Sequence, residues 1–239
     1  KIAFVSVVIL FIVREFTSVF KNFNSEYFFM YRNKLDFLNL LIIAALGIIS
    51  YIPLSFYDFI LKRKVGIRLK NRKLYKYSWI ASSIASLLGF GGAISLAFKQ
   101  YFYGSHVKDK KKLLREIGKI IFLNLTGLSV LCIIYILLEF KDIQNLGLIK
   151  YVVYGVSAYA PLVIINSLYN YKKKKDEEGF TLKVVGISFM EWTLNMLLIY
   201  LILAITGAHI KLTEYFYVYV RATAVGIVSM VPGGLGTFD

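Results

Sequence analysis

Long apolar runs separated by short basic loops are the feature that most constrains how this chain can fold. The runs cover residues 2–20, 35–61, 117–140, 148–169 and 182–206, and a last one begins at 215. About 20 apolar residues in a helix span the hydrocarbon core of a bilayer, where backbone polar groups must be satisfied within the protein. Since 58% of the residues are hydrophobic, against about 45–50% in soluble domains, the chain is predicted to be an all-α, multi-pass membrane protein with about six transmembrane helices.

Two further stretches combine this hydrophobicity with glycine-rich breaks. The run 77–98 is interrupted by the sequence GFGG at 89–92, and the last run meets PGGLG at 232–236. Backbone groups freed by such breaks are tolerated only where they are buried in protein or line a wet cavity. The candidate re-entrant turn residues are Gly89, Gly91, Gly92, Pro232, Gly233, Gly234 and Gly236. For the last break, a short loop at the end of a spanning helix is the alternative.

The basic residues predict how the segments are oriented. If 77–98 crossed the membrane, the basic loops 62–76 and 99–119 would lie on opposite faces, against the positive-inside bias. If it is instead a re-entrant hairpin, the loops 62–76, 99–119 and 172–183 share the inner face and hold 20 Lys and Arg residues, against 6 in the outer loops 21–34, 141–150 and 208–214. We therefore expect one or two re-entrant glycine-broken helices beside the spans.

The two breaks would then approach the membrane from opposite faces. Paired broken helices in corresponding halves are typical of inverted-repeat transporters with a site near the midplane. The similarity between the breaks is short, and a chance likeness is the alternative to an inverted repeat.

Charge and composition exclude several classes of site. The net charge of +15 is explained by membrane topology and contact with anionic lipid headgroups rather than by nucleic-acid binding. Cys132 stands alone, and His106 and His209 are far apart in sequence, so no metal or cofactor is expected. No motif of a catalytic nucleophile or phosphate loop is present, so no catalytic residue is assigned.

Ionisable residues inside apolar runs are costly and are therefore functional candidates. Asp58 precedes the inner boundary, and its structural alternative is a pair with Lys62, four residues on. Lys99 ends the first broken segment, either as a lysine that extends to the interface or as a charge that binds phosphate.

Three further charges complete the candidate set for headgroup binding. Glu191 lies well inside an apolar run beside Trp192 and is the strongest single case. Asp239 directly follows the Pro-Gly-Gly break. Arg221 lies in the last helix, where an interfacial position, a pair with Glu191 and a lipid phosphate are the alternatives.

Several motifs read in series resemble a known family. They are YDFIL at 57–61, GFGG at 89–92 with a base at 99 and DKKKL at 109–113, LTGLS at 125–129, MEW at 190–192 and VPGGLGTFD at 231–239. Together they are similar to the N-terminal membrane domain of bacterial phosphatidylglycerol lysyltransferases, the multiple peptide resistance factor family.

The resemblance implies that residues 1–239 form a single lipid-flippase domain in the bacterial cell membrane, as a fragment of a longer protein. In this family a C-terminal synthase part transfers lysine or alanine from aminoacyl-tRNA to phosphatidylglycerol. The membrane helices then move the product to the outer leaflet, which gives resistance to cationic antimicrobial peptides. Positions tied to translocation match Asp58, Lys99, Glu191 and Asp239 here, although the family commonly has arginine where this chain has Lys99.

The partners implied are anionic and aminoacylated phospholipids, and lysyl-tRNA through the synthase part; a homodimer is left open. Two other functions also stay open. The helices are either a membrane anchor for the lipid-aminoacylating enzyme without a transport role, or an unrelated solute or ion transporter. The sequence does not distinguish a lysyl from an alanyl headgroup.

Overall fold

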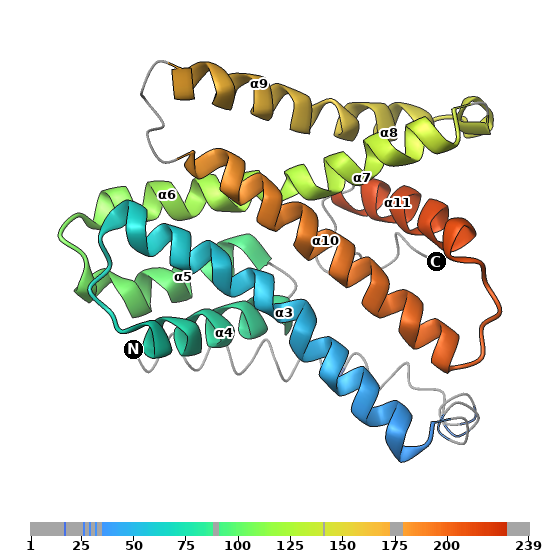
Figure 1. The fold of residues 1–239 in the computed structure, drawn as a ribbon, viewed down its shortest axis with the longest axis horizontal. Helices are drawn as coiled ribbons and strands as arrows, with labels where there is room; N and C mark the ends of the chain where they lie inside the picture. Colours follow the sequence, from blue (N-terminus) through green and yellow to red (C-terminus); the bar gives the residue numbers. More distant parts are fainter. Residues whose placement is uncertain are drawn as a thin grey trace.

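The computed structural model describes residues 35–87, 91–140, 142–172 and 179–228, together with positions 17, 26, 29 and 32. Within these residues the chain is helical and contains no strand, which confirms the all-α prediction there. The helices, shown in Figure 1, are α3 (Phe37–Val65), α4 (Asn71–Leu87), α5 (Gly91–Tyr103), α6 (Lys110–Leu123), α7 (Leu125–Leu138), α8 (Ile149–Ser157), α9 (Tyr159–Lys172), α10 (Phe180–Ile205) and α11 (Leu212–Val228). Short 3-10 turns lie at Gly104–His106 and Asp142–Asn145.

Four stretches of the described chain are long and apolar enough to cross a membrane. They are Phe37–Val65, Lys110–Leu138, Ile149–Lys172 and Phe180–Ile205, and each matches one of the predicted runs. The predicted run 2–20 lies outside the described residues, and the run from 215 forms α11, which ends where the description stops. A multi-pass membrane protein is therefore supported, while the number of six spans stays a prediction.

Helices α3 and α10 lie side by side and run in opposite directions. The Lys64 ammonium lies 5.6 Å from the centre of the Phe180 ring, and further along both helices Tyr57 bonds Glu191. Several large apolar side chains on α3, among them Leu38 and Leu41, are more than half exposed. Such exposure suits a helix that faces lipid, because lipid tails are as apolar as the side chains themselves.

Helices α4 and α5 form a hairpin around the GFGG motif. The backbone N–H of Arg68, before α4, donates to the carbonyl of His106, after α5, at 2.9 Å. The two ends of the hairpin therefore lie close together at one end of the molecule, and the re-entrant course of this segment in a membrane stays a prediction.

Gly92 has a packing role beside the predicted turn. Gly91 is the first residue of α5 and Gly92 lies in its first turn, whereas Gly89 lies outside the described residues. A Cβ on Gly92 would lie only 2.8 Å from Cγ2 of Ile121. Gly92 therefore allows α5 to approach α6 closely, and the role of these glycines in a re-entrant turn stays a prediction.

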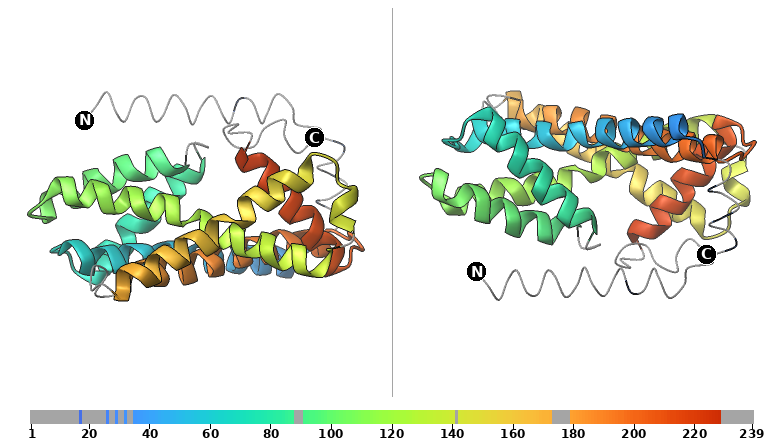
Figure 2. Two further views of the ribbon diagram at one scale, coloured as in Figure 1. Left: turned by 90° about the horizontal axis from the view of Figure 1, so that it is seen from above. Right: turned by 90° about the horizontal axis from the view of Figure 1, so that it is seen from below.

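Buried apolar side chains gather in two clusters. The first joins α3, α4, α5 and α6 with the start of α10, and the second joins α7, α8 and α11 with the rest of α10. In Figure 2 the α4–α5 hairpin and α11 stand on one face of the layer formed by α3 and α10, toward opposite ends. The second break, at 232–236, lies outside the described residues, so the inverted repeat remains a prediction.

The span Ile149–Lys172 is interrupted at Ala158, and a serine of α7 repairs the break. Pro161 has no N–H to donate to the carbonyl of Ser157, four residues earlier. The Ser129 hydroxyl donates to this carbonyl at 3.0 Å and accepts from the N–H of Ala160 at 2.8 Å. One side chain thus satisfies two backbone groups that lipid would leave unpaired.

Candidate functional site

Asp58 of α3 and Lys99 of α5 form a buried ion pair. The Lys99 Nζ lies 2.8 Å from Oδ1 of Asp58, and the two side chains are 8% and 0% exposed. The Tyr103 hydroxyl, one helical turn after Lys99, donates to the other oxygen of Asp58 at 3.1 Å. Such a pair is stable away from water only because each charge compensates the other and further hydrogen bonds complete the geometry.

Two of the structural alternatives from the sequence are wrong. Lys62 does not pair with Asp58: its ammonium donates to the carbonyl of Leu69 and to Oδ1 of Asn71, each at 2.7 Å. Lys99 does not extend to the interface, because the hairpin of α4 and α5 places it inside the helix bundle at 6% exposure.

Glu191 lies in the middle of α10 and is held by two other helices. Its Oε2 accepts from the Tyr57 hydroxyl of α3 at 2.7 Å and from the Nδ2 of Asn124 at 2.6 Å. Asn124 also donates to the Tyr57 oxygen at 3.0 Å, which closes a triangle of three polar groups. No cation of a described residue lies within 4.0 Å of the Glu191 carboxylate, although the Lys99 charge acts on it across the cavity that both residues line.

Asn124 lies where the span Lys110–Leu138 is interrupted, between α6 and α7. Its carbonyl accepts from the Ser188 hydroxyl and, at 2.7 Å, from Nε1 of Trp192. Ser188 in turn accepts from the N–H of Gly127 at 2.7 Å. A serine of the neighbouring helix therefore bridges a carbonyl and the N–H three residues later, the same arrangement as Ser129 makes at the other interrupted span.

Gly127, in the LTGLS motif, sets the closest approach between α7 and α10. A Cβ there would lie 2.3 Å from the carbonyl oxygen of Ser188 and 2.5 Å from Cδ1 of Trp192. Backbone cannot move away cheaply from such a contact, so only glycine fits. The glycine keeps Ser188 and Trp192 within reach of Asn124.

A cavity of about 220 Å³ connects the charged groups. Glu191 and Lys99 both line it, together with Tyr57 and Asn124. The α4–α5 hairpin contributes small residues to its wall: Ser82, Ala85, Ser86, Gly92 and Ser95. Apolar side chains such as Leu54 and Ile121 complete the wall, so the charged and polar groups lie at one part of a largely apolar cavity.

The remaining predicted residues lie elsewhere or outside the described chain. Arg221 lies on α11, and its Nε donates to the carbonyl of Tyr217 in the same helix at 3.0 Å. Asp239 and the residues 232–236 lie outside the described residues. The structure thus brings together Asp58, Lys99 and Glu191, three of the five predicted headgroup residues.

Sequence reasoning missed the neutral residues that hold these charges, Tyr57, Tyr103 and Asn124. Asn124 carried a usable signal, because an amide inside an apolar run must find hydrogen-bond partners in the protein. Tyr57 and Tyr103 carried none, since tyrosines are frequent throughout this chain.

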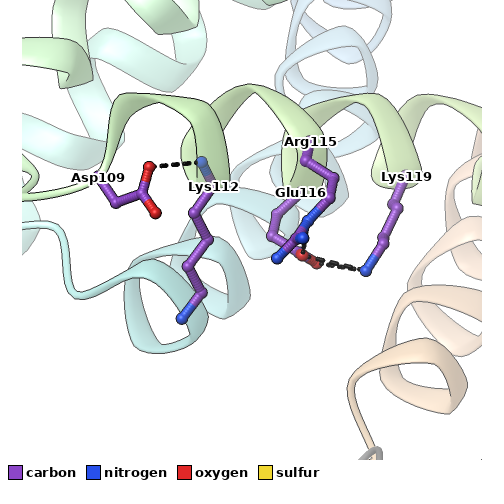
Figure 3. Close-up of polar contacts among 5 residues, drawn as sticks. All are labelled: Asp109, Lys112, Arg115, Glu116 and Lys119. Atoms are coloured by element: carbon purple, nitrogen blue, oxygen red, sulfur yellow. Dashed lines mark hydrogen bonds and ion pairs between the residues drawn. The ribbon is translucent and has the colours of Figure 1, made fainter.

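Glu116 of α6 is a further buried acid that the sequence did not single out. Figure 3 shows its carboxylate between Arg115 and Lys119, with Nε and Nζ at 3.2 and 3.0 Å from Oε1. The Glu116 side chain is 2% exposed, while Arg115 and Lys119 are 65% and 52% exposed. Asp109 in the same view caps α6 by accepting from the N–H of Lys112 at 2.9 Å. Glu116 is thus paired with two exposed bases of its own helix and does not line the cavity around Glu191.

No group of three or more His, Cys, Asp and Glu side chains in the described part of the chain is arranged to hold a metal ion. The site is therefore read from its hydrogen bonds and charges alone.

Comparison with known proteins gives one consistent result. A phosphatidylglycerol lysyltransferase of Bacillus subtilis (strain 168) is 31% identical over 248 residues, and one of Staphylococcus aureus (strain MSSA476) is 29% identical over 247 residues. Each alignment covers 100% of this chain and 29% of the relative, so the chain spans less than a third of the length of these curated relatives. No family profile matches the chain, and no solved structure matches it significantly. The resemblance predicted from the motifs is confirmed along the whole chain.

Proposed function

Because the chain is homologous from end to end to part of the phosphatidylglycerol lysyltransferases, we propose that it translocates aminoacylated phosphatidylglycerol from the inner to the outer leaflet. In this proposal the cavity that Lys99 and Glu191 line takes the headgroup while the acyl chains stay in lipid. The location is the bacterial cell membrane, and the result is resistance to cationic antimicrobial peptides.

The observation that carries the proposal is the state of Glu191. It lines a cavity among helices that are apolar enough to cross a membrane. It accepts hydrogen bonds from Tyr57 and Asn124 and makes no ion pair in the described chain. An intramembrane carboxylate without a cation is costly and marks a substrate pathway. The ammonium of a lysyl headgroup supplies the missing cation.

In this mechanism Lys99 does not simply bind the phosphate as an unpaired base would. It is bound to Asp58 before any lipid arrives, so a headgroup phosphate competes with Asp58 for the same ammonium. The released Asp58 carboxylate then offers a second site for a positive amino group. This exchange keeps charges paired throughout, which matters where an uncompensated charge costs several kcal/mol.

The proposal is tested by Glu191→Gln in cells that make the full-length protein. The amide has nearly the same shape and still accepts from Tyr57, but it loses the negative charge. A charge-assisted contact of about 1.4 kcal/mol or more corresponds to a factor of about ten. We therefore expect unchanged total lysyl-phosphatidylglycerol and an outer-leaflet appearance that is about tenfold slower, measured by labelling exposed amines on intact cells.

Glu214→Gln is the matched control, since Glu214 lies at the start of α11 with its side chain 62% exposed. It should leave both quantities unchanged. Normal outer-leaflet exposure in Glu191→Gln would contradict translocation through this cavity and favour the alternative in which the helices only anchor a lipid-aminoacylating enzyme.

The remaining partners follow from the relatives and are proposed with the same function. A synthase part outside this chain would draw on lysyl-tRNA, and anionic phospholipids would surround the basic loops. A homodimer is compatible with the exposed apolar faces of α3 and α9 but has no separate support.

A further inference from the structure

A second pocket lies at the basic end of the molecule, between the last turns of α3 and the first turn of α10. Its volume is about 230 Å³. It is lined by three aromatic, one aliphatic and two basic residues: Phe56, Phe59, Ile60, Arg63, Phe180 and Lys183. None of these residues lines the cavity around Glu191, so the two sites are separate.

The pocket is amphipathic along its length. Phe56, Phe59, Ile60 and Arg63 recur at helical spacing and therefore form one stripe along α3. Arg63 stands at the basic end of the stripe, and Phe56 lies nearly two turns deeper and is 40% exposed. A ligand with an anionic head and an apolar tail would match both parts.

Among the described residues, the charged side chains that line the pocket are both positive. The two bases that line it, Arg63 and Lys183, are exposed, and neither makes an ion pair with a described residue. Their neighbours are engaged elsewhere, because Lys62 is bonded to Leu69 and Asn71 and Lys64 lies over the Phe180 ring.

We propose that this pocket binds the phosphate of an anionic phospholipid from the inner leaflet, with an acyl chain along Phe56 and Phe59. Basic pockets between transmembrane helices on the cytoplasmic side suit such headgroups, and an arginine can hold a phosphate through two hydrogen bonds. A soluble anion would leave the exposed aromatic wall in water, whereas a lipid covers it. This site goes beyond the proposed translocation and does not depend on it.

Native mass spectrometry of the full-length protein in detergent tests the proposal. The protein is titrated with dioleoylphosphatidylglycerol, with dioleoylphosphatidylcholine, and with glycerol 3-phosphate as the soluble headgroup. We expect Arg63→Gln with Lys183→Gln to remove one tightly bound phosphatidylglycerol, with binding at that site weakened by roughly 30-fold. The charge-preserving exchange Arg63→Lys with Lys183→Arg should retain this lipid, which separates loss of charge from loss of fold.

The matched control is Arg72→Gln with Lys73→Gln, which removes two exposed bases at the start of α4, outside the pocket. It should keep the lipid, and so should Glu191→Gln, since that residue belongs to the other cavity. An unchanged lipid count in the pocket variant, or an equal loss in the α4 control, would overturn the proposal. Equally tight binding of glycerol 3-phosphate would overturn it too, by showing a site for soluble anions.

Discussion

Asp58 and Lys99 come from helices separated by the whole α4 segment, yet their charged atoms are 2.8 Å apart and almost inaccessible to solvent. A buried pair of this kind contributes little net stability compared with apolar residues of the same size. Removing one partner is different, because the other charge is then left uncompensated. The pair is therefore useful because each of its two charges can exchange its partner, and not because it adds stability.

Lys99→Met is therefore expected to destabilise the protein by about 3 kcal/mol, because Asp58 keeps only the Tyr103 hydrogen bond. The double substitution Asp58→Asn with Lys99→Met should recover most of this loss, since neither charge remains. Unfolding followed by circular dichroism in detergent measures both. Lys211→Met, at an exposed pair with 3.9 Å between charged atoms, should change little. A double variant as unstable as the single one would contradict this account.

The sequence located the charges of the site but not how they pair. Asp58, Lys99 and Glu191 stood out because they interrupt apolar runs, and they do meet. The partner of Asp58 could not be read from spacing, because Lys62 is nearer in sequence and only the hairpin brings Lys99 close. Arg221 was predicted on the same grounds and is bonded within its own helix, whereas Asp239 was predicted from its place after the Pro-Gly-Gly break and lies outside the described residues.

The interrupted spans show how helices inside an apolar environment tolerate breaks. In both cases a serine from the adjacent helix joins a carbonyl and the N–H three residues later, Ser188 at Asn124 and Ser129 at Ser157. Hydropathy predicted the boundaries of the four described spans to within four residues, except that the span beginning at Lys110 was predicted to begin at 117, and it gave no sign of the interruptions. Both lie inside uninterrupted apolar runs, where hydrophobicity is the same for a straight and a broken helix.

Ser129→Ala should lower the free energy of unfolding by about 2 kcal/mol, because two buried backbone groups lose their partner. Pro161→Ala in the same background should restore part of it, since residue 161 then has an N–H for the Ser157 carbonyl. The measurement is a double-mutant cycle of unfolding free energies. Additive effects of the two substitutions would show that Ser129 does not act on this break.

At the scale of the whole molecule, basic residues collect at one end. The hydrogen bond between Arg68 and His106 brings the loops on either side of the hairpin together, and the contact between Lys64 and Phe180 brings the start of α10 to the same end. The loop between α10 and α11 follows the other end of α10, away from these basic loops. The charge count of the sequence therefore agrees with the arrangement of the described helices.

Single cysteines introduced at Arg68, Lys108 and His209 test this arrangement in oriented vesicles. Those at 68 and 108 should react with an impermeant maleimide from the same, cytoplasmic side, and the one at 209 from the other. The native Cys132 is fully buried and provides the background, which should be unreactive. Reaction of positions 68 and 108 from opposite sides would show that the segment between them crosses the membrane.

Asn124 lies between the two packed clusters. Before it, α6 belongs to the cluster of α3 to α5; after it, α7 belongs to the cluster of α8 and α11. Asn124 also binds Glu191 through its amide, and α10, which carries Glu191, contributes to both clusters. A cation bound at Glu191 would therefore meet a carboxylate whose hydrogen bonds come from the place where the two clusters join.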